Sequence, residues 1–375
     1  MPLEPIIIGR EPDDIRKYGK RGTAFIGKHV VGTGFETHLT NPVLMDMMRP
    51  HVMLIVGKRG TGKCLHGDSL IPLSNGSLVP IKDLSKRKEK IYSLDERLKI
   101  KENEMMEFYE REVNTLIRLR LRSGREIQLT EEHPLLTLRG WRPVIELGIG
   151  SRIATPRRIF ALGSTEMPEH EVKLLAYLIA EGHVSNNFVL FSNASKQILN
   201  DFTESIRLFD PTLEIKEHSK PGCYRVTKSK EEILKTSAMR NANGTFVSRK
   251  SSLVKWLTSL GLYGKLSKNK FIPECIFKLP KGQLTLFLNR MFSCDGSIYK
   301  SRKGSKKVWE ISYSSSSKKL AHQMQHLLLR FGILSKLRKR DMRYQGKVFK
   351  SYELVIGSYN IPPFMKEIGF FGEKE

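Results

Sequence analysis

The sequence lacks the cysteine clusters and long apolar runs that define several large protein classes. It holds only four cysteines in 375 residues, far apart and without a C-x-x-C pair. This spacing argues against a zinc finger or a disulfide framework and fits a reducing compartment. The longest apolar run, residues 174–180, covers about two helical turns, far short of a membrane span. No basic-then-apolar signal segment opens the chain, so we expect a cytoplasmic protein without membrane association.

Acidic residues are scarce: 39 Asp and Glu stand against 64 Lys and Arg, a formal net charge of +25. The excess is +4 in residues 1–63 (10 basic, 6 acidic), +4 in 64–160 (18 and 14) and +17 in 161–375 (36 and 19). Such a localised excess is typical of a polyanion-binding module, although a solvated basic surface or attraction to a membrane surface would also produce it. The length and a hydrophobic content of 39% suffice for two or three domains with real cores.

An apolar run at residues 52–56 leads into a phosphate-binding pattern. Residues 57–63 (GKRGTGK) fit G-x-x-x-x-G-K, in which backbone N–H groups surround phosphates. The pattern requires a Ser or Thr next and then a helix, but Cys64 follows, with turn signals and strand alternation behind it. Either the match is accidental, or a P-loop is interrupted by an insertion after Lys63. In the second case Gly57, Gly60, Gly62 and Lys63 would bind the phosphates of ATP in the uninterrupted protein, and the Ser or Thr would bind the accompanying Mg²⁺.

Residues 18–29, together with this loop, resemble the start of archaeal HerA-type ATPases, which are DNA-translocating motors. The resemblance covers residues 1–63 and implies a partial P-loop α/β segment belonging to a host protein. Sixty-three residues do not complete such an enzyme, because hydrolysis needs further strands and an acidic Mg²⁺ ligand on one of them. We therefore expect this host segment to be inactive as an ATPase by itself.

Residues 64–160 show short strand signals with turns at Gly76, Gly124 and Gly140, which predicts a compact all-β module. The strand signals lie at residues 70–73, 78–81, 91–94, 115–121, 126–129 and 135–138. Two stretches in it carry candidate chemistry, one beginning at Cys64 and one with a T-x-x-H-P pattern at residues 130–134. The Cys64 thiol is a good nucleophile near neutral pH and can attack the Lys63 carbonyl to form a thioester. A histidine near the leaving nitrogen can donate a proton, and a threonine hydroxyl can hold the geometry. Thr130 and His133 are the candidates for these roles.

A cysteine at the junction, followed by T-x-x-H-P, resembles the first two splicing blocks of an intein, and residues 92–95 (YSLD) resemble a strand of the same region. The resemblance implies a horseshoe-shaped Hint splicing domain over residues 64–160, which starts self-splicing by an N–S acyl shift at Cys64. Each residue alone has a plainer interpretation. Cys64 could be a buried thiol, His133 a surface loop residue and Thr130 a turn former.

Inteins of this class normally end in strands with a His and a terminal Asn, before a Cys, Ser or Thr of the second host segment. The sequence stops at residues 370–375 (FFGEKE) without that ending. We expect a truncated reading frame, a split intein or a shortened version of the protein. The chain would then form the thioester and cleave after Lys63, and it would need a C-terminal intein half or host segment as partner to splice.

Beyond residue 160 the apolar period becomes helical and a long pattern occurs twice. Residues 171–180 and 283–294 predict apolar helices, each followed by a carboxylate and a glycine, Glu181-Gly182 and Asp295-Gly296. The residues behind them also match, with FSNASK at 191–196 and YSSSSK at 313–318. This is a two-copy duplication rather than a solenoid.

The repeated helices resemble those of LAGLIDADG homing endonucleases, and residues 270–273 (KFIP) resemble a further block of that family. The resemblance implies an α+β domain over residues 161–375, with two pseudo-symmetric halves at about 161–265 and 266–375. It implies a monomeric, Mg²⁺-dependent endonuclease that cleaves double-stranded DNA of the intein-free host gene. Glu181 and Asp295 would be the catalytic metal ligands, and Lys270 an auxiliary residue near the scissile phosphate.

Paired carboxylates suit this chemistry, because together they can hold the divalent ions that activate water and neutralise a leaving oxygen. Without a metal ion they would repel each other. Two departures from the family pattern stand out: Glu181 replaces the commoner Asp, and Arg290 replaces a small residue of the helix contact. Contact with DNA is expected from strands, since a β-ribbon can enter the major groove. The candidate DNA-binding residues are Arg225, Lys228, Lys303, Lys306, Lys307, Arg338 and Arg340.

Two other interpretations stay open. In the first, the chain is a P-loop ATPase or DNA translocase with a basic DNA-binding appendage, and Cys64 is an unusual P-loop residue. In the second, it is a DNA-binding protein whose nuclease fold has lost its catalytic activity. ATP hydrolysis by this chain would favour the first, and DNA binding without cleavage the second.

Overall fold

The computed structural model describes residues 4–8, 10, 12–31, 38–46, 63–185, 188–218, 220–229, 231, 250–303, 306–344 and 346–372. The chain forms two compact units, Met1–Thr61 and Gly62–Glu375. None of the helices in the described part of the chain has the length and apolar character needed to cross a bilayer.

The first unit is a small mixed sheet with one short helix. Its elements are β1 (Ile6–Ile8), α1 (Pro12–Tyr18), β2 (Thr23–Val31) and β3 (His38–Asp46). The strand order is β1-β3-β2, with β1 parallel and β2 antiparallel to β3. The buried Arg10 guanidinium donates hydrogen bonds to the carbonyls of Gly19 and Arg21 at 2.8 and 2.7 Å, which fastens the turn after α1. The expected strand at 52–56 and the P-loop residues Gly57, Gly60 and Gly62 lie outside the described residues.

The part of the second unit up to residue 160, here the splicing region, consists of antiparallel strand pairs. They are β4 (Leu70–Pro72) with β5 (Leu78–Pro80), β6 (Ile91–Leu94) with β7 (Ile100–Asn103), β8 (Ile117–Arg120) with β9 (Glu126–Leu129), and β10 (Pro134–Thr137) with β11 (Gly140–Pro143). Short 3-10 helices follow β5 and β11, η2 (Ile81–Lys86) and η3 (Val144–Glu146). The expected turn glycines Gly76, Gly124 and Gly140 have φ of 88°, 83° and 87°, a conformation that favours glycine. The β-rich character predicted from the sequence is therefore present.

The remainder, here the endonuclease region, repeats one topology twice. The first copy contains α2 (Glu169–Ala180), β12 (Gly182–Ser185), β13 (Phe188–Ser192), α3 (Lys196–Phe209), β14 (Leu213–Glu217) and β15 (Cys223–Lys228). The second contains α7 (Lys281–Asp295), β16 (Gly296–Lys303), β17 (Lys306–Ser315), α8 (Lys318–Arg330), β18 (Ser335–Tyr344) and β19 (Lys347–Ile356). The remaining described elements are α5 (Ser252–Ser259), η4 (Ser267–Asn269), α6 (Glu274–Phe277), η5 (Ser358–Asn360) and α9 (Ile361–Glu367).

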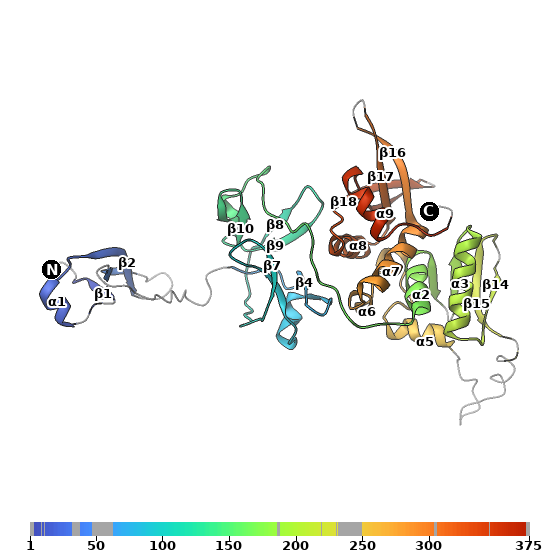
Figure 1. Cartoon of the computed structure of the whole chain (residues 1–375), viewed down its shortest axis with the longest axis horizontal. Coiled ribbons are helices and arrows are strands. Elements are labelled where there is room, and N and C mark those ends of the chain that lie inside the picture. Colours follow the sequence, from blue (N-terminus) through green and yellow to red (C-terminus); the bar gives the residue numbers. More distant parts are fainter. Residues whose placement is uncertain are drawn as a thin grey trace, which may run out of the picture. The chain divides into compact units, whose positions relative to one another are not determined.

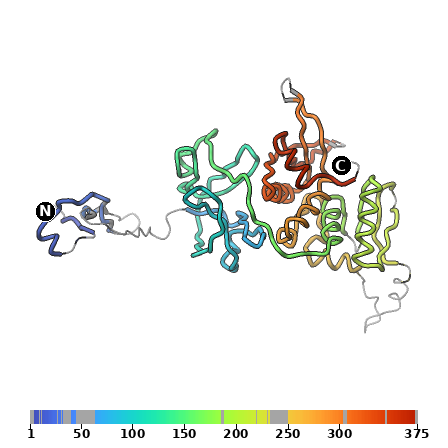
Figure 2. The backbone as a smooth tube through the Cα atoms, viewed as in Figure 1, coloured from blue at the N-terminus to red at the C-terminus, as the bar shows by residue number. Residues whose placement is uncertain are grey.

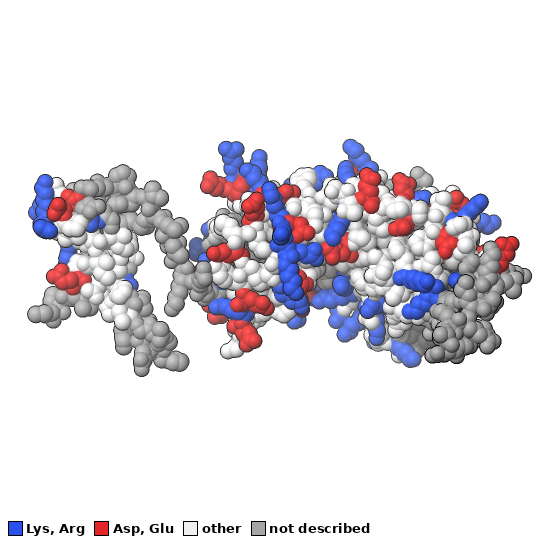
Figure 3. Space-filling model, turned by 90° about the horizontal axis from the view of Figure 1, so that it is seen from below, with Lys and Arg blue, Asp and Glu red and all other residues white. Residues whose placement is uncertain are grey.

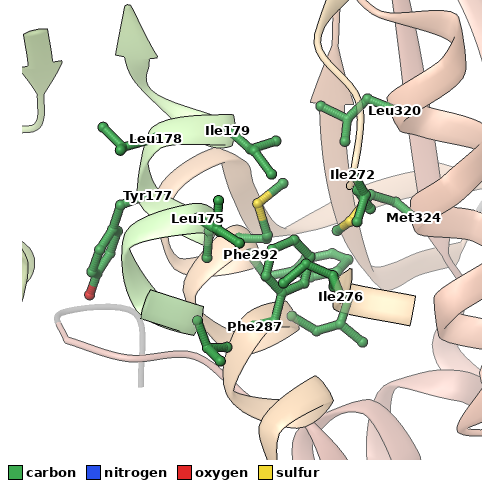
Figure 4. Packing of buried hydrophobic residues seen from close by; sticks show 14 of the residues in the cluster. Leu175, Tyr177, Leu178, Ile179, Ile272, Ile276, Phe287, Phe292, Leu320 and Met324 are labelled. Atoms are coloured by element: carbon green, nitrogen blue, oxygen red, sulfur yellow. The ribbon is translucent and has the colours of Figure 1, made fainter. Parts of the chain in front are cut away.

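The two sheets have matching strand orders, β12-β13-β15-β14 and β16-β17-β19-β18, so the repeat in the sequence is one fold built twice. The helices α2 and α7 lie side by side at its centre (Figure 1). Figure 4 shows Leu175 and Ile179 of α2 directed towards Phe287 and Phe292 of α7, while Tyr177 points to the other side of α2. Figure 2 shows the chain passing from the splicing strands along an extended segment to α2.

Both central helices stop at a glycine for a steric reason. A Cβ on Gly182 would lie 2.5 Å from the Leu178 carbonyl oxygen, and one on Gly296 would lie 2.4 Å from that of Phe292. A Cβ atom does not come this close to a nonbonded oxygen, so the backbone can leave each helix this tightly only at a glycine. As a result Glu181 and Asp295 occupy equivalent positions at the ends of two adjacent helices.

Arg290, where the family pattern has a small residue, binds a carboxylate of α3 that is shared with α2. Its Nε donates to Asp201 Oδ2 at 2.8 Å, and its guanidinium stacks 3.9 Å from the centre of the Phe371 ring. Asp201, on α3, also accepts hydrogen bonds from Lys173 Nζ at 2.8 Å and Tyr177 Oη at 2.6 Å. Burial would raise the pKa of Asp201, but these three hydrogen bonds together lower it. Through Asp201 the arginine thus ties α7 to α3, and the same carboxylate ties α3 to α2.

Candidate functional site

The first candidate site joins Cys64 to the end of β9, 66 residues later in the chain. The Cys64 N–H donates a hydrogen bond to Thr130 Oγ1 at 2.9 Å, and the Thr130 N–H donates to the Cys64 carbonyl at 3.0 Å. A β-bridge between Leu65 and Leu129 continues this pairing. Thr130 is only 4% exposed. The amide nitrogen that would leave in an acyl shift is therefore already held by the hydroxyl of Thr130.

His133 lies beside the same peptide. Its backbone N–H donates to the Thr130 carbonyl at 3.1 Å, and its Nδ1 is buried without a hydrogen-bond partner among the described residues. The pKa of His133 is lowered, mainly by burial and also by the charge of Lys63, while the Cys64 backbone acts to raise it. The structure thus brings together the three residues that the sequence suggested for splicing. None of the four cysteines forms a disulfide, so the Cys64 sulfur is available as a thiol.

The second candidate site lies at the ends of α2 and α7. Lys270 Nζ donates hydrogen bonds to the carbonyls of Leu178 and Ala180 at 3.3 and 3.1 Å, the last turn of α2. Burial lowers the pKa of Lys270 to about 8, while the nearby charges of Asp295 and Glu181 act to raise it. Lys270 thus lies at the end of α2, close enough to both carboxylates for their charges to act on it, so the structure brings together the three residues that the sequence suggested for the endonuclease.

Two residues that the sequence analysis did not single out face these carboxylates. Asn193 Nδ2 donates a hydrogen bond to Glu181 Oε2. Burial, and after it the charge of Asp295, raises the pKa of the buried Tyr313 well above its usual range. Both lie in the duplicated stretches 191–196 and 313–318, so the repeat itself was the signal that could have identified them.

A divalent cation fits the oxygen ligands Glu181 and Asp295, because Mg²⁺ prefers carboxylates and retains several other oxygen ligands. Among the described residues, no group of three or more His, Cys, Asp or Glu side chains could hold a metal ion. An ion shared by Glu181 and Asp295 would therefore need further ligands from water and from DNA phosphate oxygens.

The candidate DNA-binding residues do not all lie on one face of their sheets. In β15, Val226 is buried, so by strand alternation Arg225 points to the opposite, outer face, where it stacks 4.7 Å from the Phe188 ring centre. Lys228 shares the inner face with Val226. In β18, Leu337 is buried, which places Arg338 and Arg340 on the outer face.

Arg340 on this outer face is paired with Glu353 at 2.8 Å. Lys303 and Lys306 are paired in register at the β16–β17 turn, next to the exposed Lys307. On the face drawn in Figure 3, Lys and Arg side chains form several separate groups with Asp and Glu between them. The basic excess is therefore distributed over this face rather than gathered in one patch.

Comparison with known proteins adds one family match and three similar proteins. The family profile described as "LAGLIDADG-like domain" matches residues 282–369. The Replication factor C small subunit of Methanocaldococcus jannaschii is 30% identical over 346 residues, covering 87% of this chain and 17% of that protein. A DnaB intein from Synechocystis sp. PCC 6803, known as a crystal structure, is 33% identical, covering 26% of this chain and 70% of that chain, with a TM-score of 0.21.

The homing endonuclease I-DmoI, crystallised in complex with DNA and Mn, is 13% identical and covers 54% of this chain and 96% of that chain, with a TM-score of 0.32. The chain spans 17% and 36% of the length of the first two curated relatives that it matches. The sequence identity to the DnaB intein extends over more than two thirds of that chain, and the family profile covers nearly all of the second copy of the duplicated fold and the helix α9 that follows it. The chain belongs to the inteins, with a Hint splicing region and a LAGLIDADG homing endonuclease domain.

Proposed function

We propose that this intein begins its own excision by an N–S acyl shift at Cys64. The observation that carries this proposal is the Cys64 N–H bond to Thr130 Oγ1 beside His133. In the reaction, Cys64 Sγ attacks the Lys63 carbonyl carbon, a C–S bond forms, and the C–N bond to Cys64 breaks. The thiol loses its proton, and the departing nitrogen gains one to become an amine. Thr130 holds that nitrogen in place, and His133 carries the proton to it.

Thiol-induced cleavage tests this proposal. Dithiothreitol should attack the thioester and release residues 1–63, and Cys64→Ala should abolish the release. His133→Ala should slow it, because the amine then departs without a proton donor. Cys223→Ala, which removes a cysteine in the endonuclease region, is the matched control and should cleave like the parent. ATP hydrolysis by this chain, with no thiol-induced cleavage, would favour the interpretation as a P-loop ATPase with a DNA-binding appendage.

For the second site we propose Mg²⁺-dependent, site-specific cleavage of double-stranded DNA. The supporting observation is the position of Lys270 beside both Glu181 and Asp295. When bound, Mg²⁺ would supply activation of water and neutralisation of the leaving oxygen. The protein's own residues hold the ion at two helix ends and place a cationic ammonium close to the phosphate. Asn193 fixes the orientation of the Glu181 carboxylate.

Incubation with a duplex that carries the uninterrupted P-loop sequence of the host gene tests this activity. We expect Mg²⁺-dependent nicking and double-strand cleavage, abolished by Glu181→Gln or Asp295→Asn. The exposed carboxylate Glu204 on α3 provides a matched control, and Glu204→Gln should leave cleavage unchanged. Specific binding of the duplex without any cleavage by the unaltered protein would instead identify a DNA-binding protein with a decayed nuclease.

We also propose that the host is a HerA-type ATPase, interrupted within its P-loop, and that it acts in the cytoplasm after splicing. The support is the resemblance of residues 18–29 and the G-x-x-x-x-G-K pattern ending at Lys63. The second host segment would begin with Ser or Thr, which first accepts the acyl group and afterwards binds Mg²⁺. Reading the gene beyond codon 375 tests this: His-Asn, then Ser or Thr and an apolar helix, is the expected result, and another continuation would contradict it.

A further inference from the structure

The hairpin β8–β9 connects the splicing site to the endonuclease region. Its β9 end is the Leu129–Thr130 segment, which holds Cys64, and the His66 N–H donates to the Gln128 carbonyl at 2.9 Å along the same edge. The other end is the turn at Ser123–Gly124. The two ends of the hairpin therefore have different partners, Cys64 at the open end and the endonuclease region at the turn.

The turn of this hairpin is fixed to α8 and β18. The Leu337 N–H donates to the Ser123 carbonyl at 2.8 Å. Gln325, 1% exposed, donates from Nε2 to the same carbonyl at 3.0 Å and to the Ser335 carbonyl at 3.0 Å. A Cβ on Gly124 would lie 2.3 Å from the Leu337 carbonyl oxygen, so the two backbones touch directly.

A second turn of the splicing region is held in the same manner. The Arg330 guanidinium, 1% exposed, donates to the Gly76 carbonyl at 2.6 Å and to the Phe277 carbonyl at 2.7 Å. A Cβ on Gly76 would lie 2.2 Å from the Phe277 carbonyl oxygen. A buried guanidinium is costly unless its N–H groups are satisfied, so separating these surfaces would leave donors without acceptors.

The splicing region has little internal packing to replace these contacts. Among the described residues, its hydrophobic cluster has three buried members, Leu73, Val79 and Leu84, on the β4–β5 side. The partly buried residues packed against them are Ile71, Ile81, Ile91, Met105 and Phe108. A two-stranded ribbon such as β8–β9 is at best marginally stable in water by itself. The register that places Thr130 opposite Cys64 therefore depends on what holds the hairpin at its turn.

We propose that the second half of the endonuclease region is a positioning element of the splicing site, with Gln325 and the Leu337 backbone holding the hairpin turn so that Thr130 meets Cys64. This rests on the proposed function of Cys64. A small shift of Thr130 would move its hydroxyl away from the scissile nitrogen, and displacements of about 1 Å can cost roughly 100-fold in rate.

A pair of glycine substitutions tests the proposal. Gly124 and Gly140 both sit in hairpin turns of the splicing region at φ of 83° and 87°, so alanine strains both backbones alike. Nothing lies within 4 Å of a Cβ on Gly140, whereas on Gly124 it meets Leu337. We expect Gly124→Ala to slow dithiothreitol-induced cleavage after Lys63 by about 10-fold or more, and Gly140→Ala to cleave within about twofold of the parent.

Hydrogen exchange supplies a readout that does not depend on cleavage. The amides of Cys64, His66 and Thr130 should lose protection in Gly124→Ala and keep it in Gly140→Ala. Gln325→Leu removes the side-chain donor to Ser123 without backbone strain and should act in the same direction as Gly124→Ala, more weakly. Circular dichroism of the helices and amide exchange in β4–β5 show whether the endonuclease region and the splicing region of each variant are folded, and if Gly124→Ala is not folded, Gln325→Leu decides.

Equal cleavage rates and equal exchange in both glycine variants would overturn the positioning role. An unaltered protein that fails to cleave with thiol would remove the splicing proposal instead. In that case the exchange comparison still decides whether the endonuclease region holds the hairpin.

Discussion

The two regions of Gly62–Glu375 stabilise their sites in different ways. In the endonuclease region one hydrophobic cluster runs through both copies of the fold, and the carboxylates stand at the ends of its two central helices. In the splicing region the strands come in separate pairs, the cluster is small, and Cys64 is held by backbone hydrogen bonds to a distant strand. The endonuclease site is supported by the hydrophobic packing around it. The splicing site is supported by hydrogen bonds between the Cys64 segment and the end of β9.

This difference indicates which substitutions each site should tolerate. A site on packed helix ends is disturbed by changes deep in the core, many residues away. A site held by strand pairing is disturbed mainly by changes in register, including changes at the far end of the same hairpin. The predictions below test this contrast, from the largest expected effect to the smallest.

The largest effect is expected at the partly buried ion cluster around Asp201 in the endonuclease region. Asp201→Ala leaves Lys173 and Arg290 without their carboxylate, and the expected cost is about 3–5 kcal/mol of unfolding free energy, measured by urea denaturation. Glu214→Ala, which breaks an exposed ion pair with Lys216, is the control and should cost about 1 kcal/mol or less. Similar losses in both variants would show that the ion cluster does not support the core.

Equivalent cavities in the two regions should affect different observables. Leu288→Ala and Leu73→Ala each remove a fully buried side chain, at an expected cost of about 2–5 kcal/mol. Because the α-helices of the described second unit lie in the endonuclease region, Leu288→Ala should lower the midpoint of the helical circular dichroism signal. Leu73→Ala should mainly increase amide exchange in β4–β6. If Leu73→Ala lowered the helical midpoint as much as Leu288→Ala, the two regions would unfold as one cooperative unit, which would contradict the contrast between them.

Acid should weaken the contact between the regions through a buried histidine. Burial, and after it the charges of Arg330 and Arg125, lowers the pKa of His326 well below its usual value. The folded protein therefore keeps His326 neutral, while the unfolded chain takes up a proton below about pH 6.5. The stability that depends on neutral His326 is complete above that pH and is lost as the pH falls, by at most about 1.4 kcal/mol per unit.

His326→Gln should flatten the pH dependence of the unfolding free energy between pH 7.5 and 5.5. The matched control is His170→Gln at the start of α2, which replaces a histidine outside this contact. His322, whose pKa is also lowered by burial, should account for part of the slope that remains. An unchanged slope in His326→Gln would mean that this histidine is protonated without cost.

The smallest effect concerns single DNA contacts. Arg225 lies on the outer face of its sheet and Lys228 on the inner one. Arg225→Ala should therefore reduce the slope of log K for DNA binding against log salt concentration by about one. Lys228→Ala should change the slope less, although both residues were sequence candidates. Binding titrations at several salt concentrations measure this, and equal changes would show that the DNA does not follow the outer face.

Several elements could be predicted from local patterns. Alternating apolar residues predicted β4, β6 and β9, and the helical period predicted α2 and α7 almost to their ends. The strands β7 and β11 were missed because Ile100–Asn103 and Gly140–Pro143 have no apolar alternation. They are strands because each pairs through its backbone with the strand before it, β6 and β10.

The sequence by itself determined the G-x-x-x-x-G-K pattern that ends at Lys63 before Cys64, the T-x-x-H-P pattern and the duplicated helices with their terminal carboxylates. These features depend on residues near one another in the chain, whose spacing follows from helix and strand periods. Only the tertiary structure decided that Thr130 meets Cys64, that Lys270 lies beside Glu181 and Asp295, and that Arg290 turns to Asp201. Contacts between distant residues depend on which surfaces pack and on the entropy of closing the loops between them, and no local pattern records either.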